Sequence, residues 1–413
     1  MPTFKLRRFF SQPGILRGID PENLLALLAD HAAALEAAGL ALPDVGTALG
    51  FDYELLTRLM MAPDRLPAKL CEAFYFIHQM ATPEGMDCLL VAAERAQPPI
   101  EIVGTPAPTP GDVAVQVWLK NRELLESVHA KQFSESVRSF HSFRMAVTSA
   151  PAPRDTAEAV AHIKDDLDHF FERKKRGRHT KVFPYVQDDS IMFLIRHGDP
   201  FERRGAIGNR GESVGVYYWP EKFDVLILDP VEGELRIHAK NPSEWDEYRK
   251  VFGRRLYGDS SFFSVEEKYT LEPLRVIGED SLAPIGGMER VILTEVHYLW
   301  DGRARTNEIH RSGDVFVDYR TRRLQPSKAP RIAKARFRIT FSDSTKPRTV
   351  TIKPPNEAQY MRDDDGVIVE KWLKRNGFIV MPGRTSSGKT NHEPAHYEPA
   401  HNEPTVEKVL VVA

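Results

Sequence analysis

Cationic side chains alternate with apolar ones in the segment 331–341, where Lys334, Arg336 and Arg338 occupy every second position. Successive side chains of a β-strand point to opposite faces of the sheet, so these three cations are expected on one face and the apolar residues between them on the other. Ammonium and guanidinium groups in such rows bind the phosphates of nucleic acids. The segment therefore predicts a half-buried strand whose solvent face binds a polyanion.

The surrounding chain is strongly basic. Residues 301–353 contain 14 Lys and Arg against 5 Asp and Glu, a balance of +9, whereas residues 1–100 have a balance of −4. A second basic run lies at 173–176. We predict that the cations of both regions contact nucleic acid; they are Arg173, Lys174, Lys175, Arg176, Arg320, Arg322, Arg323, Lys334, Arg336, Arg338, Arg348 and Lys353. The alternative is that they neutralise the acidic helical part of the chain or an acidic protein partner.

A histidine next to an arginine could carry phosphoryl transfer. Arg196, His197 and Gly198 follow an apolar run, and a histidine that accepts phosphate needs a neighbouring guanidinium to hold that phosphate. The triplet resembles the signature of the phosphohistidine phosphatase and phosphoglycerate mutase family. That resemblance implies a nucleophilic role for His197 and a phosphate-holding role for Arg196. The family's second His-Gly pair does not occur in this chain, so we predict that His197 is a structural histidine at the end of a strand and not a nucleophile.

A second set of candidate catalytic residues is Asp259, Glu266 and Lys268. Carboxylates at such spacing bind magnesium, and a nearby lysine polarises the attacking water. The set resembles the Asp…Glu-x-Lys cluster of metal-dependent nucleases. The alternative is a solvated charged turn, because such triplets are frequent in charged sequences.

Two further motifs lie in the C-terminal segment. Residues 383–390, GRTSSGKT, resemble the phosphate-binding loop of P-loop NTPases, but no helix is expected after Thr390 to direct its amino end at a phosphate. The run from His392 to His396 fits the zinc-peptidase pattern, but Pro394 would break the helix that this chemistry requires. We therefore predict neither a cofactor nor a metal site.

Composition limits the class of protein. The 413 residues are enough for two or three domains, and a hydrophobic fraction of 42% is enough to form their cores. Cys71 and Cys88 are too few for a disulfide framework, and both are expected to be reduced and buried. The N-terminus lacks the apolar region of a secretory signal, and the most apolar stretch, 24–42, contains charged residues. We expect a cytoplasmic protein with no membrane contact.

Four regions are expected to position these residues. Residues 1–97 should form a helical domain, 98–181 a Pro-rich connector with linker helices, 182–381 a β-rich domain with a cationic face, and 382–413 a low-complexity tail. Within the second region we predict one helix at about 112–128 and another at about 156–175. In the β-rich domain we predict helices at about 242–252 and 363–376, and strands at 190–196, 213–219, 223–229, 233–239, 289–299, 313–319, 331–341 and 347–353.

Many strands with few intervening helices indicate an α+β fold with a mostly antiparallel sheet. Together the patterns favour a nucleic-acid-binding accessory protein within a larger assembly, without enzymatic activity. Two alternatives stay open: a metal-dependent nuclease or phosphohydrolase, and a non-catalytic scaffold that binds other proteins.

Overall fold

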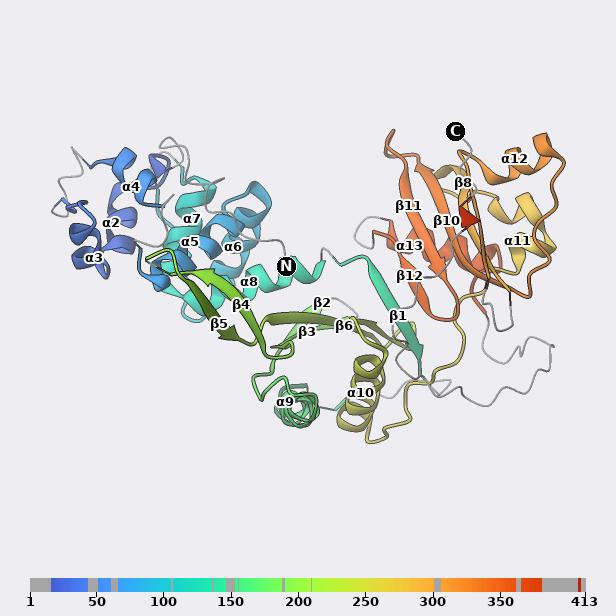
Figure 1. Ribbon diagram of the computed structural model, residues 1–413, viewed down its shortest axis with the longest axis horizontal. Helices are drawn as coiled ribbons and strands as arrows, with labels where there is room; N and C mark the ends of the chain where they lie inside the picture. Colours follow the sequence, from blue (N-terminus) through green and yellow to red (C-terminus); the bar gives the residue numbers. More distant parts are fainter. Residues whose placement is uncertain are drawn as a thin grey trace. The chain divides into compact units, whose positions relative to one another are not determined.

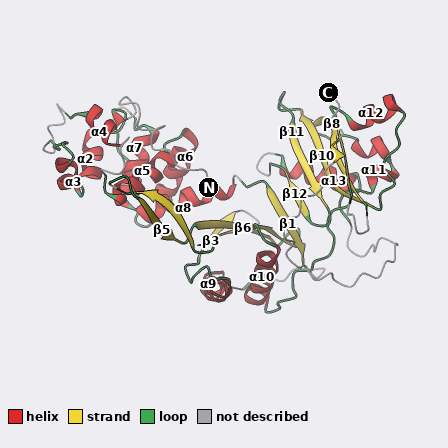
Figure 2. Cartoon of the chain, viewed as in Figure 1, coloured by secondary structure: helices red, strands yellow, loops and turns green. Residues whose placement is uncertain are grey.

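The structure is a computed structural model that describes most of the chain. The described residues are 16–43, 51–60, 66–104, 107–135, 137–145, 153–154, 156–187, 190–208, 210–300, 306–361, 365–380 and 408–409. They belong to two compact units, Met1–Ser136 and Val137–Ala413. The first is helical and the second combines helices with a large sheet (Figures 1 and 2).

The first unit contains seven described helices around one apolar core. They are α2 (Pro21–Ala29), α3 (Ala32–Ala37), α4 (Tyr53–Met60), α5 (Ala68–Met80), α6 (Pro83–Arg95), α7 (Pro110–Lys120) and α8 (Arg122–Glu135). Helix α7 is central, since every residue from Asp112 to Val117 is buried. The buried Asp112 carboxylate accepts hydrogen bonds from the backbone N–H of Asp20 (2.9 Å) and from Asn23 (3.0 Å), which fixes the start of α2 against α7.

The second unit is organised by a single sheet of eleven described strands. Its order is β13-β9-β8-β10-β11-β12-β1-β7-β6-β3-β2, and every neighbouring pair is antiparallel apart from β13 and β9. The strands are β1 (Ser139–Arg144), β2 (Lys181–Gln187), β3 (Ser190–Gly198), β6 (Glu221–Asp229), β7 (Glu234–His238), β8 (Met288–Leu299), β9 (Asn307–Arg311), β10 (Arg331–Phe341), β11 (Arg348–Lys353), β12 (Glu357–Gln359) and β13 (Lys408–Val409). A separate hairpin consists of β4 (Glu202–Ile207) and β5 (Ser213–Tyr218).

The remaining elements of this unit are helical. They are α9 (Thr156–Arg173), α10 (Pro242–Phe252) with the π-helical turn η3 (Gly253–Tyr257), α11 (Pro273–Val276), the 3-10 turn η4 (Gly278–Leu282), α12 (Val315–Arg322) and α13 (Gly366–Arg375). Helices α9 and α10 share an apolar core with β1, β3, β6 and β7. Helices α11, α12 and α13 share another with β8, β10 and β11.

These two cores lie on opposite faces of the sheet. Ile237 of the α9/α10 core pairs with His141 of β1, which lies on the same face as Ser139. Ser139 pairs with Gln359 of β12, and Gln359 pairs with Thr351 of β11. Thr351 in turn pairs with Arg336 of β10. Paired residues of neighbouring strands lie on the same face. The face that α9 and α10 cover in one half is therefore the face that carries Arg336 in the other half, where α11, α12 and α13 pack on the reverse side.

The fold class predicted from the sequence, α+β with a mostly antiparallel sheet, is confirmed. Strands occur at seven of the eight predicted positions, and α9, α10 and α13 lie where helices were predicted. The predicted strand at 313–319 is wrong. This segment forms α12, because the Asp314 carboxylate accepts hydrogen bonds from the backbone N–H groups of Phe316 and Val317 and so caps a helix. The single helix predicted at 112–128 is two, α7 and α8, which are separated at Asn121.

Candidate nucleic-acid interface

The exposed face of strands β9, β8, β10 and β11 carries a row of cations. In β10, Lys334, Arg336 and Arg338 lie on this face, while Phe337 and Ile339 are fully buried on the other, as the alternation predicted. Cross-strand pairing adds three more cations from the other strands, and Arg331 at the start of β10 lies on the same side because it pairs with Leu299. The name cationic face is used here for six of these residues, which are Arg290, Arg311, Lys334, Arg336, Arg338 and Lys353.

A buried carboxylate lies at the centre of the cationic face. Glu295 of β8 has a side chain only 1% exposed, yet it is directly opposite Arg336 on one side and Arg311 on the other. Its Oε1 lies 2.6 Å from Nζ of Lys334 and 2.7 Å from Nε2 of His297. Its Oε2 lies 2.8 Å from Nε of Arg311 and 3.3 Å from Nη1 of Arg336.

These contacts keep Glu295 ionised. Burial opposes ionisation, but hydrogen bonds from Lys334, His297 and Arg311 outweigh it and lower the pKa of Glu295 to about 2. The same carboxylate fixes the positions of three long cationic side chains. Such ordering reduces the conformational entropy that these side chains would lose on binding a ligand.

One carboxylate cannot neutralise this row. Lys334, Arg311 and Arg336 share Glu295, which leaves two positive charges in excess around it. Lys353 pairs with Glu357 at 2.7 Å, whereas the guanidinium of Arg290 is 3.9 Å from its nearest carboxylate, that of Asp314. Arg338 is exposed and donates to the backbone oxygen of Gly313 at 3.1 Å. The face therefore has a net positive charge, with guanidinium groups open to solvent.

The other predicted nucleic-acid contacts lie elsewhere. Arg320, Arg322 and Arg323 are on α12 or at its end, and α12 packs through Phe316 and Tyr319 on the opposite side of the sheet. Arg348 shares the side of Ile339 rather than that of Arg338, and its guanidinium forms ion pairs with Asp365 and Asp343. These four residues are thus not part of the cationic face.

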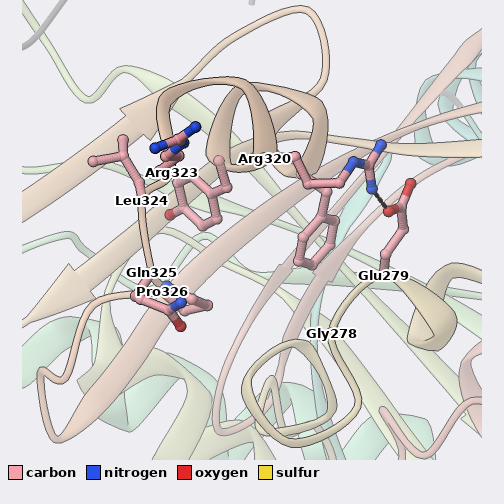
Figure 3. A pocket seen from close by; sticks show the side chains of 9 residues that line it. Gly278, Glu279, Arg320, Arg323, Leu324, Gln325 and Pro326 are labelled. Carbon is pink, nitrogen blue, oxygen red and sulfur yellow. Dashed lines mark ion pairs between the residues drawn. The ribbon is translucent and has the colours of Figure 1, made fainter.

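Arg320 and Arg323 line a shallow pocket of about 440 Å³ beside α12 (Figure 3). The pocket also contains Phe316, Tyr319 and the 324–326 segment. The guanidinium of Arg320 is paired with the carboxylate of Glu279 across it. Because that pair already neutralises Arg320, the pocket offers less positive charge than the cationic face.

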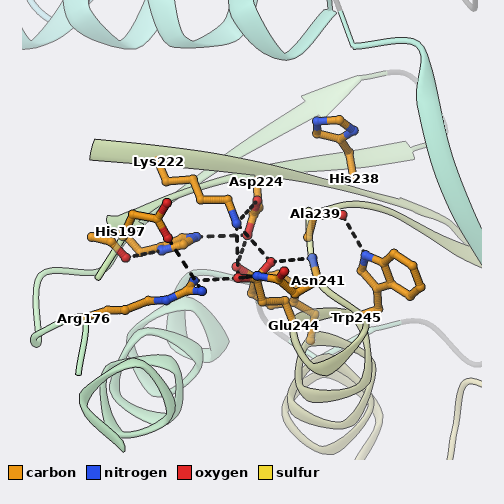
Figure 4. A network of polar contacts seen from close by, with 12 residues as sticks. Arg176, His197, Lys222, Asp224, His238, Ala239, Asn241, Glu244 and Trp245 are labelled. Atoms are coloured by element: carbon orange, nitrogen blue, oxygen red, sulfur yellow. Dashed lines mark hydrogen bonds and ion pairs between the residues drawn. The ribbon is translucent and has the colours of Figure 1, made fainter. Parts of the chain in front are cut away.

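The basic run at 173–176 is divided between two environments. Arg176 has a side chain 11% exposed and is held by Glu244 of α10 at 2.5 Å (Figure 4). Lys222 of β6 binds the same carboxylate at 3.0 Å, and the pKa of Glu244 is about 2 because these contacts outweigh its burial. Arg176 thereby joins the end of α9 to α10. Arg173, Lys174 and Lys175 remain exposed.

His197 lies inside this same network. Its ring is fully buried and stacks on Phe171 at 3.9 Å, its Nε2 is 3.0 Å from Asp224 and its Nδ1 is 2.8 Å from the oxygen of Gly198. Tyr248 donates to the same Asp224 oxygen at 2.7 Å. A ring so enclosed contacts no solvent, and both nitrogens are engaged. Arg196, the next residue along β3, points to the other face and pairs with Glu221 at 3.5 Å.

The nuclease-like residues do not converge. Asp259 and Glu266 are exposed, and the Asp259 carboxylate accepts hydrogen bonds from Ser261. Lys268 is buried and its amine binds Glu234 of β7 at 2.7 Å and Glu370 of α13 at 3.5 Å. Lys268 thus connects the two halves of the second unit. No group of three or more His, Cys, Asp or Glu side chains suited to a metal ion occurs in the described ranges.

The phosphate-loop and zinc-peptidase patterns at 383–390 and 392–396 lie outside the described residues. Cys71 and Cys88 are not joined in a disulfide, and both are partly buried. Across the part of the chain that the structure describes, no helix combines the length and apolar character needed to cross a bilayer. No protein-family model matches the chain, and no match to a curated protein was found.

Sequence reasoning found the β10 cations but missed Glu295, Arg290 and Arg311. Arg290 and Glu295 lie within a segment predicted as a strand, but the pairing that sets them beside β10 is not visible in the linear sequence. Arg311 ends β9, a five-residue strand that was not predicted. The only signal was its +9 basic surroundings.

Proposed function

We propose that this protein binds nucleic acid through the cationic face and acts as a non-enzymatic accessory protein within a larger assembly. The observation that carries the proposal is the row of six cations across four strands, with three of the cations ordered by one buried carboxylate. Phosphate groups repeat along a nucleic acid, so they match a row of cations better than one isolated charge does. We place this role in the cytoplasm, in keeping with two cysteines that are not joined in a disulfide.

The test is a salt titration of a variant that removes only exposed cations. Arg290, Arg336 and Arg338 are to be replaced together by Gln, leaving Lys334 and Arg311 on Glu295 so that the buried charge stays paired. Each phosphate contact contributes about 0.9 to the slope of log affinity against log salt on duplex DNA. The variant should therefore lower the slope by about two to three for all base sequences alike.

The matched control replaces Arg320, Arg322 and Arg323 by Gln, which removes the same charge from the opposite side of the sheet. Affinity and salt slope should change much less in this variant. If the wild type binds neither duplex nor single strand at low salt, the proposal is wrong and an acidic protein partner becomes the better explanation. Equal effects of the two triple variants would show that net charge, not the cationic face, governs binding.

A further inference from the structure

The β4–β5 hairpin presents an aromatic surface to solvent. Phe201, Tyr217 and Trp219 are 49%, 61% and 44% exposed. The Phe201 ring lies 4.6 Å from that of Trp219 and 6.3 Å from that of Tyr217, with an interplanar angle of 20° to the latter. Three contacting aromatic rings on a two-stranded ribbon leave ring surface uncovered, which is unusual for side chains of this size.

The hairpin register gives this surface its chemistry. Arg203 pairs with Tyr217, Gly205 with Gly215, and Ile207 with Ser213, so all six residues share the face of the aromatic rings. The glycine pair places no side chain beside the rings, and the space over Gly205 is open. A methyl group at Gly215 would lie 2.7 Å from Nε of Arg203 and 3.0 Å from a ring carbon of Tyr217, so the guanidinium and the phenol ring extend over this glycine.

Charge is segregated between the two faces of the hairpin. Among the described residues of the two strands, the aromatic face carries Arg203 and no carboxylate. Glu202 lies on the reverse face, where it binds Arg204 at 2.9 Å and the Tyr218 hydroxyl at 3.1 Å. Within β4 and β5, the exposed rings therefore share their face with a cation and with no carboxylate.

Rings beside a guanidinium match the chemistry of unpaired nucleobases. An aromatic side chain stacks on the face of any base, and an arginine can stack as well or bind the adjoining phosphate. Bases in a duplex are already stacked on one another and are not available to such a surface. The carboxylates of an acidic protein could pair with Arg203. The three rings would add little binding energy to such a complex unless the partner also supplied an apolar side chain.

We propose that the β4–β5 hairpin is a stacking site for single-stranded nucleic acid, with Phe201, Tyr217 and Trp219 contacting bases and Arg203 contacting a phosphate. This inference rests on the proposed function and extends it, because it names unpaired strands as the preferred ligand. The cationic face would then bind the backbone generally, while the hairpin would distinguish single strands from duplexes.

The experiment compares the full-length protein with a variant that carries Phe201→Ala and Tyr217→Ala. Fluorescence anisotropy measures binding of one labelled mixed-sequence oligonucleotide, alone and annealed to its complement. Single-strand affinity should fall by about fivefold or more, since each stacked base contributes at least that much, and duplex affinity should not change. Val216→Ala is the matched control, because Val216 is 47% exposed but lies on the reverse face of the hairpin.

A second measurement does not depend on affinity. Addition of the single strand should quench tryptophan fluorescence in the wild type, and the quenching should diminish in Trp219→Phe. Circular dichroism and thermal unfolding should be unchanged in every hairpin variant, because the substituted rings are exposed.

Three results would overturn the inference. The hairpin proposal fails if the double variant binds single strands with the affinity of the wild type. The proposed function stands in that case if the triple Gln variant of the cationic face still lowers the slope of log affinity against log salt. If the wild type binds no nucleic acid, both fail. If single-strand binding is unchanged but sedimentation shows that the double variant has lost self-association, the hairpin is a protein contact.

Discussion

At the scale of single residues, one unpredicted carboxylate determines how the predicted cations are arranged. The alternation in 331–341 was enough to predict that Lys334, Arg336 and Arg338 share a face. It was not enough to predict Glu295, because that residue reaches them only through the pairing of β8 with β10. His197 is of a residue type suited to catalysis, but Phe171, Asp224 and its own strand enclose its ring, so a substrate cannot reach it. Residue identity indicated chemistry in both places, but burial decides whether that chemistry can be reached.

The depressed pKa of Glu295 predicts acid sensitivity. Its folded-state pKa is about 2, below the value of about 4.3 for a free glutamate, so its ionisation stabilises the fold fully above about pH 5. That contribution, on the order of 3 kcal/mol, is lost as the pH falls from 5 towards 2. Glu295→Gln should be less stable at pH 7 and should show a smaller decrease in unfolding free energy over this range.

The measurement is denaturant unfolding at several pH values. Glu289→Gln, at an exposed position of the same strand, controls for the loss of one formal charge. The interpretation would be contradicted if Glu295→Gln lost stability with acid as steeply as the wild type. Some slope must remain in either case, because Glu244 also has a pKa of about 2.

At the scale of secondary structure, segments with a clear apolar pattern were predicted even when short, as β5, β7 and β11 show. The apolar runs that became β3, β6, β8 and β10 each have seven or more residues that follow one pattern or are buried continuously. The missed strands β1, β4, β9, β12 and β13 have six residues or fewer and no more than two apolar residues each. The missed strand β2 has seven residues, but it contains Pro184, which is uncommon inside a strand. Segment 313–319 alternates like a strand, but its local capping residue favours a helix.

The cap of α12 can be tested directly. Asp314→Ala removes the acceptor for the N–H groups of Phe316 and Val317 and should lower the unfolding free energy by about 1 kcal/mol. Asp314→Asn should retain most of the stability, because an amide oxygen can accept the same hydrogen bonds. Chemical denaturation measures both variants. Asp318→Ala is the control within the helix, since it removes only a weak pair with Arg322 at 3.4 Å. Equal losses at 314 and 318 would argue against the cap.

At the scale of the whole molecule, the two halves of the sheet bury opposite faces. Half of it is covered by α9 and α10 and the other half by α11, α12 and α13 on the reverse side. In the part of the chain that the structure describes, the helices of this half leave its other face open, and that face carries the cationic row. The α+β class followed from the order of strands and helices, but no pattern in the sequence indicates which face each helix covers. Lys268, read as catalytic, instead connects these halves through Glu234 and Glu370.

The division into two units predicts that each folds alone. One apolar cluster extends from Leu16 to Val128, and the two others lie between Phe143 and Phe378, so each cluster is confined to one unit. A unit with its own core should unfold cooperatively in isolation. Fragments 1–136 and 137–413 should therefore each give a sigmoidal denaturation curve, and circular dichroism of the first should be that of a helical protein.

Only one of the two fragments should bind nucleic acid. The cationic face and the β4–β5 hairpin both belong to 137–413, so this fragment should bind nucleic acid with the salt slope of the full chain. The fragment 1–136 should not bind, because its first hundred residues have a charge balance of −4. The same anisotropy titration, made on both fragments and on the full chain, tests this. A folded 137–413 that binds much more weakly than the full chain would show that the helical unit contributes to the interface, and the cationic face would then be only part of it.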